Sequence, residues 1–485
     1  MGEQRHWTAR FPVRFLAEIV VLTLLVAAFA SYRFDLGERW FGWGPADPAT
    51  EPAAVAPPEG LKLPATAPAR LVARPSASVP GDPAEVAATV QPMLRKRVLG
   101  PHVGVLVTDL GTGRLLFRSG AAAVTPASTT KLLTSAAALS SLGPMARFRT
   151  TVRYAPGTRQ LVLVGGGDPF LASSPKAGAD SYPDRADVVT LANETVRKLR
   201  QMKVKRVRLG FDDSYFTGPS VNPHWPASYI PEGVVPPISA LWVDEGLDSD
   251  GYGYVSDPAA VAAATFRTAL GAAGLKVGPQ VRRVTAPAAG SEVASVSSAP
   301  LGEIVQRTLA VSDNQAAEVL ARQVGLAERQ EGSFEAGAAA VLGVLRRLGV
   351  PVSGDVLYDG SGLSRENLLT TESLSAVVRL SASPQHPELR EVLTGLPVAG
   401  FTGSLAYRFE RGPDEARGRV RAKTGTLTGV HGLAGVADDV DGARLAFVVV
   451  ADKVRPLKEF QAQTLIDRIA GALGACTCGV GSAHE

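Results

Sequence analysis

Residues 126–142 predict a buried helix whose first turn carries a serine and a lysine. A proline at 126 suits the first turn of a helix, and a Gly-Pro pair ends the pattern. The stripe expected to face the core consists of small and apolar side chains: Leu132, Leu133, Ala136, Ala137, Leu139 and Ser140. Ser128 and Lys131 are three residues apart and therefore share one face of the helix. The pattern places a hydroxyl group next to an amine.

This pair of groups is suited to acyl-transfer chemistry. A serine hydroxyl is a poor nucleophile until a neighbour takes its proton, and a lysine can do so only where its surroundings keep it neutral near pH 7. A second Ser-x-x-Lys match, at 173–176, lies in a loop rich in Pro, Gly and Ala, where Pro175 disfavours a continuing helix. Ser128 and Lys131 are therefore the candidate nucleophile and base.

A Ser-Asp-Asn run at 312–314 precedes an apolar helix predicted at 315–324. Ser312 can relay a proton, and Asn314 can hydrogen-bond a substrate amide. A similar run at 220–222 is followed by a proline and by no helical pattern. Taken alone, a Ser-x-Asn run most often marks a turn or a helix cap, so its interpretation depends on the other motifs.

A predicted strand near the C-terminus ends in a Lys-Thr-Gly-Thr run. Lys423 offers a cation for a substrate carboxylate, Thr424 offers a hydroxyl, and Gly425 leaves room for substrate backbone. The backbone N–H groups of Thr426 and Ser128 are expected to form an oxyanion hole. Without the other two motifs, Lys423 would be interpreted as an ordinary lysine on an edge strand.

The three motifs occur in the order Ser-x-x-Lys, Ser-x-Asn, Lys-Thr-Gly, and the sequence thereby resembles the serine penicillin-recognising family of penicillin-binding proteins and β-lactamases. Ser128 and Ser312 lie 184 positions apart, which is more than a compact β-lactamase needs. The excess is similar to the inserted domain of the class C low-molecular-mass group, the D-alanyl-D-alanine carboxypeptidase/endopeptidases. Three further segments resemble that group: Gly165 to Pro169, Asp359 to Arg365, and Leu396 to Gly400 leading to Arg408. The likeness runs from Ala84 to Leu473.

The resemblance implies a mechanism for these residues. Ser128 would attack the carbonyl of the penultimate D-alanine of a peptidoglycan stem peptide while Lys131 accepts its proton, and β-lactams would acylate the same serine. Lys423 would hold the terminal carboxylate, and its charge would depress the pKa of Lys131. Ser312 would pass the proton to the leaving amine, and water would then release the acyl-enzyme.

Asp168 and Arg365 are the expected contacts for the side chain of the acyl donor, since similar positions in the family border the site. A simpler alternative stays open for each residue. Asp168 would then only cap a turn, and Arg365 would only support a loop.

The N-terminal 83 residues predict export and a tether. Residues 1–32 are interpreted as a signal peptide or a membrane anchor: three arginines precede an apolar run, a small-x-small cleavage site follows, and the stretch at 15–32 is just long enough to span a bilayer. Both alternatives place the rest of the chain outside the cytoplasmic membrane. Residues 33–83 are rich in Pro and Ala and predict an extended tether, because they cannot bury enough surface to offset their ordering entropy.

The remaining chain predicts an α/β protein of the α+β type. Residues 84–145 and 298–475 are expected to build a transpeptidase/β-lactamase-like domain, an antiparallel sheet flanked by helices that includes a hairpin of strands at 430–436 and 444–450. Residues 146–297 predict an inserted, mainly β domain, and residues 476–485 form a tail.

Composition argues against several other classes of protein. The 50 basic and 46 acidic residues are scattered, so nucleic-acid binding is not indicated. Only His431 of six histidines lies near a motif, and no Gly-x-Ser-x-Gly run surrounds Ser128, so a Ser-His-Asp hydrolase is not indicated. Cys476 and Cys478 predict a local disulfide or two idle thiols, because no third thiol or histidine pair lies nearby. No cofactor or metal is expected.

Two alternatives to a carboxypeptidase/endopeptidase remain open at the level of the sequence. One is a β-lactamase or esterase on the same fold. The other is a non-catalytic envelope scaffold that binds glycan or partner proteins, although a binding module needs no nucleophile–base pair.

Overall fold

The computed structural model describes residues 79–178, 181–287 and 290–480. The first and last thirds of this part build a five-stranded antiparallel sheet in the order β10-β11-β12-β1-β2. Its strands are β1 Val103–Asp109, β2 Leu115–Gly120, β10 Val420–Leu427, β11 Val430–Asp438 and β12 Arg444–Ala451. The strand β10, which carries the Lys-Thr-Gly run, is therefore an edge strand.

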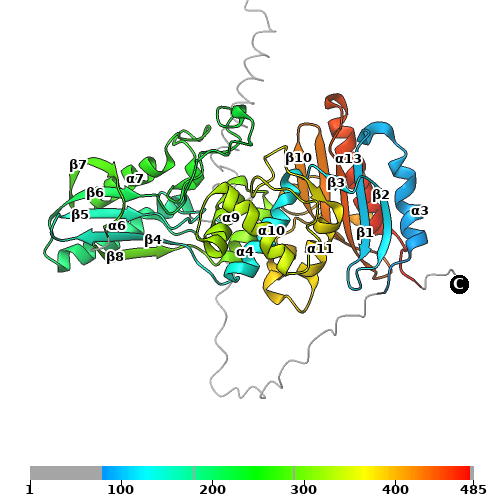
Figure 1. Cartoon of the computed structure of the whole chain (residues 1–485), viewed down its shortest axis with the longest axis horizontal. Coiled ribbons are helices and arrows are strands. Elements are labelled where there is room, and N and C mark those ends of the chain that lie inside the picture. The colour runs from blue at the N-terminus through cyan, green and yellow to red at the C-terminus, as the bar shows by residue number, and fades with distance from the viewer. Residues whose placement is uncertain (1–78, 179–180, 288–289, 481–485) are drawn as a thin grey trace, which may run out of the picture. The chain divides into compact units, whose positions relative to one another are not determined.

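Helices cover both faces of this sheet (Figure 1). Successive residues of β1 alternate between the two layers: Val105 and Val107 pack with one helical layer, and Leu106 packs with the other. The first layer consists of α3 Pro83–Leu94 and α13 Glu459–Ala475. The second consists of α4 Thr130–Leu142, α8 Leu301–Ala310, α9 Asn314–Arg329, α10 Phe334–Arg347, α11 Thr371–Ala382 and α12 Arg390–Thr394. This arrangement confirms the expected α+β class.

The segment between α4 and α8 contains a second five-stranded sheet, in the order β7-β6-β5-β4-β8. Its strands are β4 Arg149–Ala155, β5 Gln160–Val164, β6 Arg206–Asp212, β7 Lys276–Arg283 and β8 Ser291–Ser297. The first and last of these, β4 and β8, pair with each other, so the segment leaves and rejoins the rest of the chain at neighbouring strands. The limits of the inserted domain stay a prediction.

The prediction of a mainly β insertion is wrong, because the insertion also contains two long helices. The pairs β5–β6 and β6–β7 are parallel, and parallel neighbours need long crossovers, usually helical. These crossovers are α6 Val188–Gln201 and α7 Pro258–Ala272, which share one apolar cluster with the sheet. The alanine-rich α7, whose N-terminus is capped by Asp257, was not predicted.

Short elements connect these layers. They are β3 Ala123–Val124, β9 Leu369–Thr370, α5 Pro175–Gly178, and the 3₁₀ turns η2 Arg97–Leu99, η3 Ala127–Thr129, η4 Ala227–Tyr229, η5 Asp244–Gly246, η6 Pro387–Leu389, η7 Gly403–Leu405, η8 Asp414–Ala416 and η9 Pro456–Lys458. The turn η3 leads directly into α4 and carries Ser128.

The two cysteines form the local disulfide that was one of the two expectations for the tail. Cys476 is bonded to Cys478, and the backbone N–H of Asp82 donates to the carbonyl of Cys478 over 2.6 Å. Across residues 79–178, 181–287 and 290–480, no helix has the length and hydropathy to cross a membrane. The predicted leader at 1–32 and most of the tether lie outside the described residues.

Candidate active site

The turn that carries Ser128 packs tightly against two glycines. A Cβ on Gly425 would lie 2.7 Å from the carbonyl oxygen of Pro126, and a Cβ on Gly362 would lie 1.9 Å from that of Ala127. Gly362 also has a φ of +89°, which favours glycine. The edge of β10 and the loop around Gly362 therefore reach the nucleophile's backbone only because both positions lack a side chain.

Lys131 joins the first two motifs. Its side chain is fully buried, and its Nζ donates hydrogen bonds to Ser128 Oγ at 2.9 Å, to Asn314 Oδ1 at 2.8 Å and to the Ser361 carbonyl oxygen at 2.8 Å. Burial lowers the pKa of Lys131 from 10.5 to about 8, against the attraction of Glu318 and other carboxylates. An amine in this environment can lose its proton near neutral pH, as a general base for Ser128 must.

Lys423 joins the third motif to the second. Its Nζ donates to Ser312 Oγ at 2.8 Å, to the Thr424 carbonyl oxygen at 3.0 Å and to Thr424 Oγ1 at 3.2 Å. Burial lowers the pKa of Lys423 well below its usual value, and the nearby Lys131 lowers it further. The two buried amines therefore resist carrying charge at the same time.

The Lys423–Leu427 part of β10 is the open part of the sheet edge. Further back along β10, Ala399 and Ala422 donate backbone hydrogen bonds to Val420 and Pro397, so the Leu396–Gly400 segment occupies the edge there. Thr424, Gly425 and Thr426 lie beyond this pairing and face the turn of Ser128 through Gly425. An edge strand can accept an extended peptide as an additional strand.

Arg365 and Asp168 lie in different surroundings. The Arg365 guanidinium is exposed and donates to the Thr428 carbonyl oxygen at 3.0 Å, so it lies just beyond the end of β10. The Asp168 side chain is buried, and its carboxylate accepts the N–H of Phe170 at 2.9 Å. Burial raises the pKa of Asp168 to about 7. No hydrogen bond or ion pair between described residues joins Asp168 to the three motifs.

Two residues of this site were missed at the level of the sequence. The Ser361 carbonyl is a ligand of Lys131, and Glu318 is a fully buried carboxylate that accepts the N–H of Ser361. A signal for Glu318 was available, because it follows Asn314 by four residues and so shares its helix face. The Ser361 contact had no signal in the sequence, because every residue has a backbone carbonyl that can accept a hydrogen bond.

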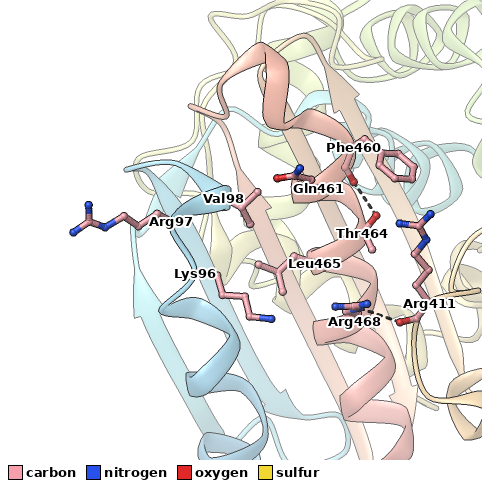
Figure 2. Close-up of a pocket in the computed structure, with 9 residues that line it drawn as sticks. All are labelled: Lys96, Arg97, Val98, Arg411, Phe460, Gln461, Thr464, Leu465 and Arg468. Atoms are coloured by element: carbon pink, nitrogen blue, oxygen red, sulfur yellow. Dashed lines mark hydrogen bonds between the residues drawn. The ribbon is translucent and has the colours of Figure 1, made fainter.

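A separate pocket of about 580 Å³ lies between η2, Arg411 and α13 (Figure 2). It is lined by basic and apolar side chains that include Lys96, Arg468 and Phe460 (Figure 2). None of the motif residues lines this pocket. The candidate active site is therefore the cluster around Lys131 and Lys423.

A serine held beside a buried lysine, with the Ser-x-Asn and Lys-Thr-Gly motifs around them on this α+β fold, defines a serine penicillin-recognising enzyme. Comparison with known proteins narrows the class. The family model described as "D-Ala-D-Ala carboxypeptidase 3 (S13) family" matches residues 86–249 and 252–474. The chain belongs to this family.

Named relatives agree with this assignment. The chain is 33% identical over 468 residues to "Carboxypeptidase DacB" of Mycolicibacterium smegmatis, covering 95% of this chain and 96% of that protein. It is 31% identical to the "D-alanyl-D-alanine carboxypeptidase" of Actinomadura sp. strain R39, covering 72% and 78%. The crystal structure of penicillin-binding protein 4 from Haemophilus influenzae shares the fold, with a TM-score of 0.65, 20% identity, and coverage of 81% and 99%. The expected resemblance to the class C low-molecular-mass group is confirmed.

Proposed function

We propose that this chain is a serine-type D-Ala-D-Ala carboxypeptidase that hydrolyses the terminal bond of peptidoglycan stem peptides through an acyl-enzyme, and that penicillin acylates the same serine. The observation that carries the proposal is the 2.9 Å hydrogen bond between the fully buried Lys131 Nζ and Ser128 Oγ, across which an uncharged amine would accept the serine's proton. The carboxypeptidase names of the relatives and the family support the substrate class.

In the acylation step, Ser128 Oγ bonds to the carbonyl carbon of the penultimate D-alanine while its proton passes to the uncharged Lys131 Nζ. The C–N bond to the terminal D-alanine then breaks, and the proton returns through Ser312 to the leaving amine. In the second step water adds to the acyl carbon, one of its protons passes to Ser128 Oγ, and the ester bond breaks to release the acid and restore the serine. Asn314 supports the first step, because its Oδ1 accepts one Lys131 N–H and so orients the amine.

The third motif suits a free terminal carboxylate. The buried Lys423 Nζ and Thr424 Oγ1 lie side by side and can donate hydrogen bonds to one carboxylate. Ser404 Oγ lies 3.1 Å from Thr424 Oγ1 and adds a third hydroxyl or amine group. A bound carboxylate would stabilise the charged form of Lys423 and offset its burial. The open edge of β10 would pair with the backbone of the substrate, and the N–H groups of Ser128 and Thr426 would bind the oxyanion.

Arg365 and Asp168 differ in how well their surroundings support a contact with substrate. The exposed Arg365 beside the end of β10 suits a contact with the acyl donor's side chain. For Asp168, the hydrogen bond from Phe170 supports the turn-cap interpretation more than a substrate contact.

We also propose that the protein is exported, with residues 1–32 as the signal peptide or membrane anchor and the following tether outside the membrane. The peptidoglycan substrate and the Arg-flanked apolar leader support this location. N-terminal sequencing of the exported protein distinguishes a cut leader from an anchor.

The rate of D-alanine release from an N-acylated D-Ala-D-Ala pentapeptide should rise with pH and level off above about pH 8. The base form of Lys131 is the active form, and burial lowers its pKa to about 8, so the uncharged amine predominates only above that pH. Below it the rate should fall about tenfold per pH unit. A rate that is flat or falls between pH 6 and pH 9 would contradict this assignment of the base.

Incubation with penicillin, beside this assay, separates the alternatives. A β-lactamase or esterase would turn over penicillin rapidly instead of retaining an acyl adduct. A scaffold would release no D-alanine and retain no penicillin.

A further inference from the structure

Glu318 is a fully buried carboxylate one helical turn beyond Asn314 on α9. Its Oε1 accepts the N–H of Ser361 at 2.8 Å, and both of its oxygens lie 3.2 Å from the N–H of Gly360. The mechanism above does not use this carboxylate. Burying a charged carboxylate costs free energy unless it has hydrogen-bond donors, and here the donors are backbone N–H groups of one short loop.

That loop, Asp359–Gly362, lies between α9 and the N-terminal half of α4. A Cβ on Gly360 would lie 2.5 Å from Ala321 Cβ on α9. Thr134 of α4 donates its hydroxyl hydrogen to the Gly360 carbonyl oxygen at 2.7 Å. The loop is therefore in close contact with α9 and hydrogen-bonded to α4.

The loop provides one hydrogen-bond acceptor for the catalytic lysine. The Ser361 N–H is held by Glu318, and the Ser361 carbonyl oxygen accepts the Lys131 N–H at 2.8 Å. Lys131 has two other acceptors, Ser128 Oγ and Asn314 Oδ1. The first two turns of α9 thus contribute twice to the position of the amine: Asn314 contacts it directly, and Glu318 acts through one residue, Ser361.

The charges around Lys131 come from several elements. Glu318 and Asp313 belong to α9 and its N-cap, and Asp359 to the loop; all three favour the charged form of Lys131. Lys423 on β10 is the opposing cation.

Glu318 is itself held between opposing effects. Burial, and secondarily Asp359, raise the pKa of Glu318 to about 8, whereas the hydrogen bonds from Ser361 and Gly360 lower it. Arg322, one turn further along α9, also faces this carboxylate. Because Glu318 favours the charged form of Lys131, a charged Lys131 equally favours the charged form of Glu318. The negative charge on Glu318 is therefore most stable when Lys131 carries a proton.

We propose that Glu318 is a positioning residue of the acylation step: it holds the Ser361 carbonyl against Lys131 and supplies the negative charge that balances this lysine when it carries the serine's proton. The proposal rests on the function proposed above. It assigns a purpose to the Asp-Gly-Ser-Gly segment, which the sequence marked as similar to the family and which the three motifs leave unexplained.

The test compares the penicillin acylation rate against pH for the full-length protein and for Glu318→Gln. Removing the negative charge should make Lys131 easier to deprotonate, so the acidic limb of the profile should move to lower pH by about one unit. The plateau rate should fall about tenfold to hundredfold because the Ser361 carbonyl is less firmly placed. Glu328→Gln is the matched control, since it makes the same change near the other end of α9, in an ion pair with Arg347, and should move neither quantity.

A limb that stays in place in Glu318→Gln overturns the proposal, even if the variant is slower or less stable, since a purely structural carboxylate would give that result. Glu318→Asp covers the case in which the glutamine variant does not fold. It keeps the charge on a side chain shorter by one methylene, so we expect the wild-type limb with a reduced plateau; an unchanged plateau counts against the proposal.

If the wild-type protein is not acylated, the proposed function is overturned. The effect of Glu318 on Lys131 would then be measured directly. Lysine side-chain NMR, with Lys131 assigned by its replacement, would then follow the Lys131 titration. A lower Lys131 pKa in Glu318→Gln supports the pairing, and equal values in the two proteins contradict it.

Discussion

Ser128→Ala should release no measurable D-alanine from a D-Ala-D-Ala pentapeptide, a loss of at least about 10⁴-fold in kcat/KM. The substitution removes the only atom proposed to bond to the substrate, and Lys131 retains its hydrogen bonds to Asn314 and Ser361. We therefore expect an unchanged thermal unfolding midpoint. The measurement is D-alanine release by the purified protein at pH 8 and above.

Ser173→Ala is the matched control for this experiment. Ser173 begins the second Ser-x-x-Lys match, and its backbone N–H, which the substitution leaves intact, donates to Asp244. It should keep the wild-type rate. Comparable losses in the two variants would mean that position 128 holds no special role.

Lys131→Met should lower the rate of penicillin acylation by about 10²-fold to 10⁴-fold, the usual contribution of a general base. Methionine fills a similar volume and carries no charge, so the fully buried site should tolerate it better than it tolerates a smaller side chain. The residual rate should also lose the rise with pH up to about pH 8, because the group whose pKa burial lowers to that value is gone. The measurement is the acylation rate with a fluorescent penicillin between pH 6 and pH 10.

Lys176→Met is the corresponding control. Lys176 is exposed in the short helix α5, and its replacement should change neither rate nor pH profile. If Lys131→Met keeps the wild-type rise with pH, another group is the base.

The sequence was most informative where residue type and spacing alone define the geometry. The predicted hairpin at 430–436 and 444–450 corresponds to β11 and β12, which extend it by one or two residues. Ser128 and Lys131 were predicted on one helical face, and the structure places the lysine amine 2.9 Å from the hydroxyl. Local periodicity is sufficient for both.

It was less informative where distant segments meet. Ser361 reaches Lys131 through a backbone carbonyl across 230 positions, and no side chain marks that contact. The helix α7 was missed because its alanines give no apolar stripe, although tertiary packing places Phe266 and Leu270 in a core. Asp168 lies in a segment typical of the family, yet its burial depends on the packing of the insertion around it.

The most direct measurement is the mass of the protein and of its proteolytic peptides after brief exposure to penicillin. We predict a gain of one penicillin per chain, carried by the peptide that contains Ser128 and absent from Ser128→Ala. No gain in mass, or an adduct that persists in Ser128→Ala, would contradict it.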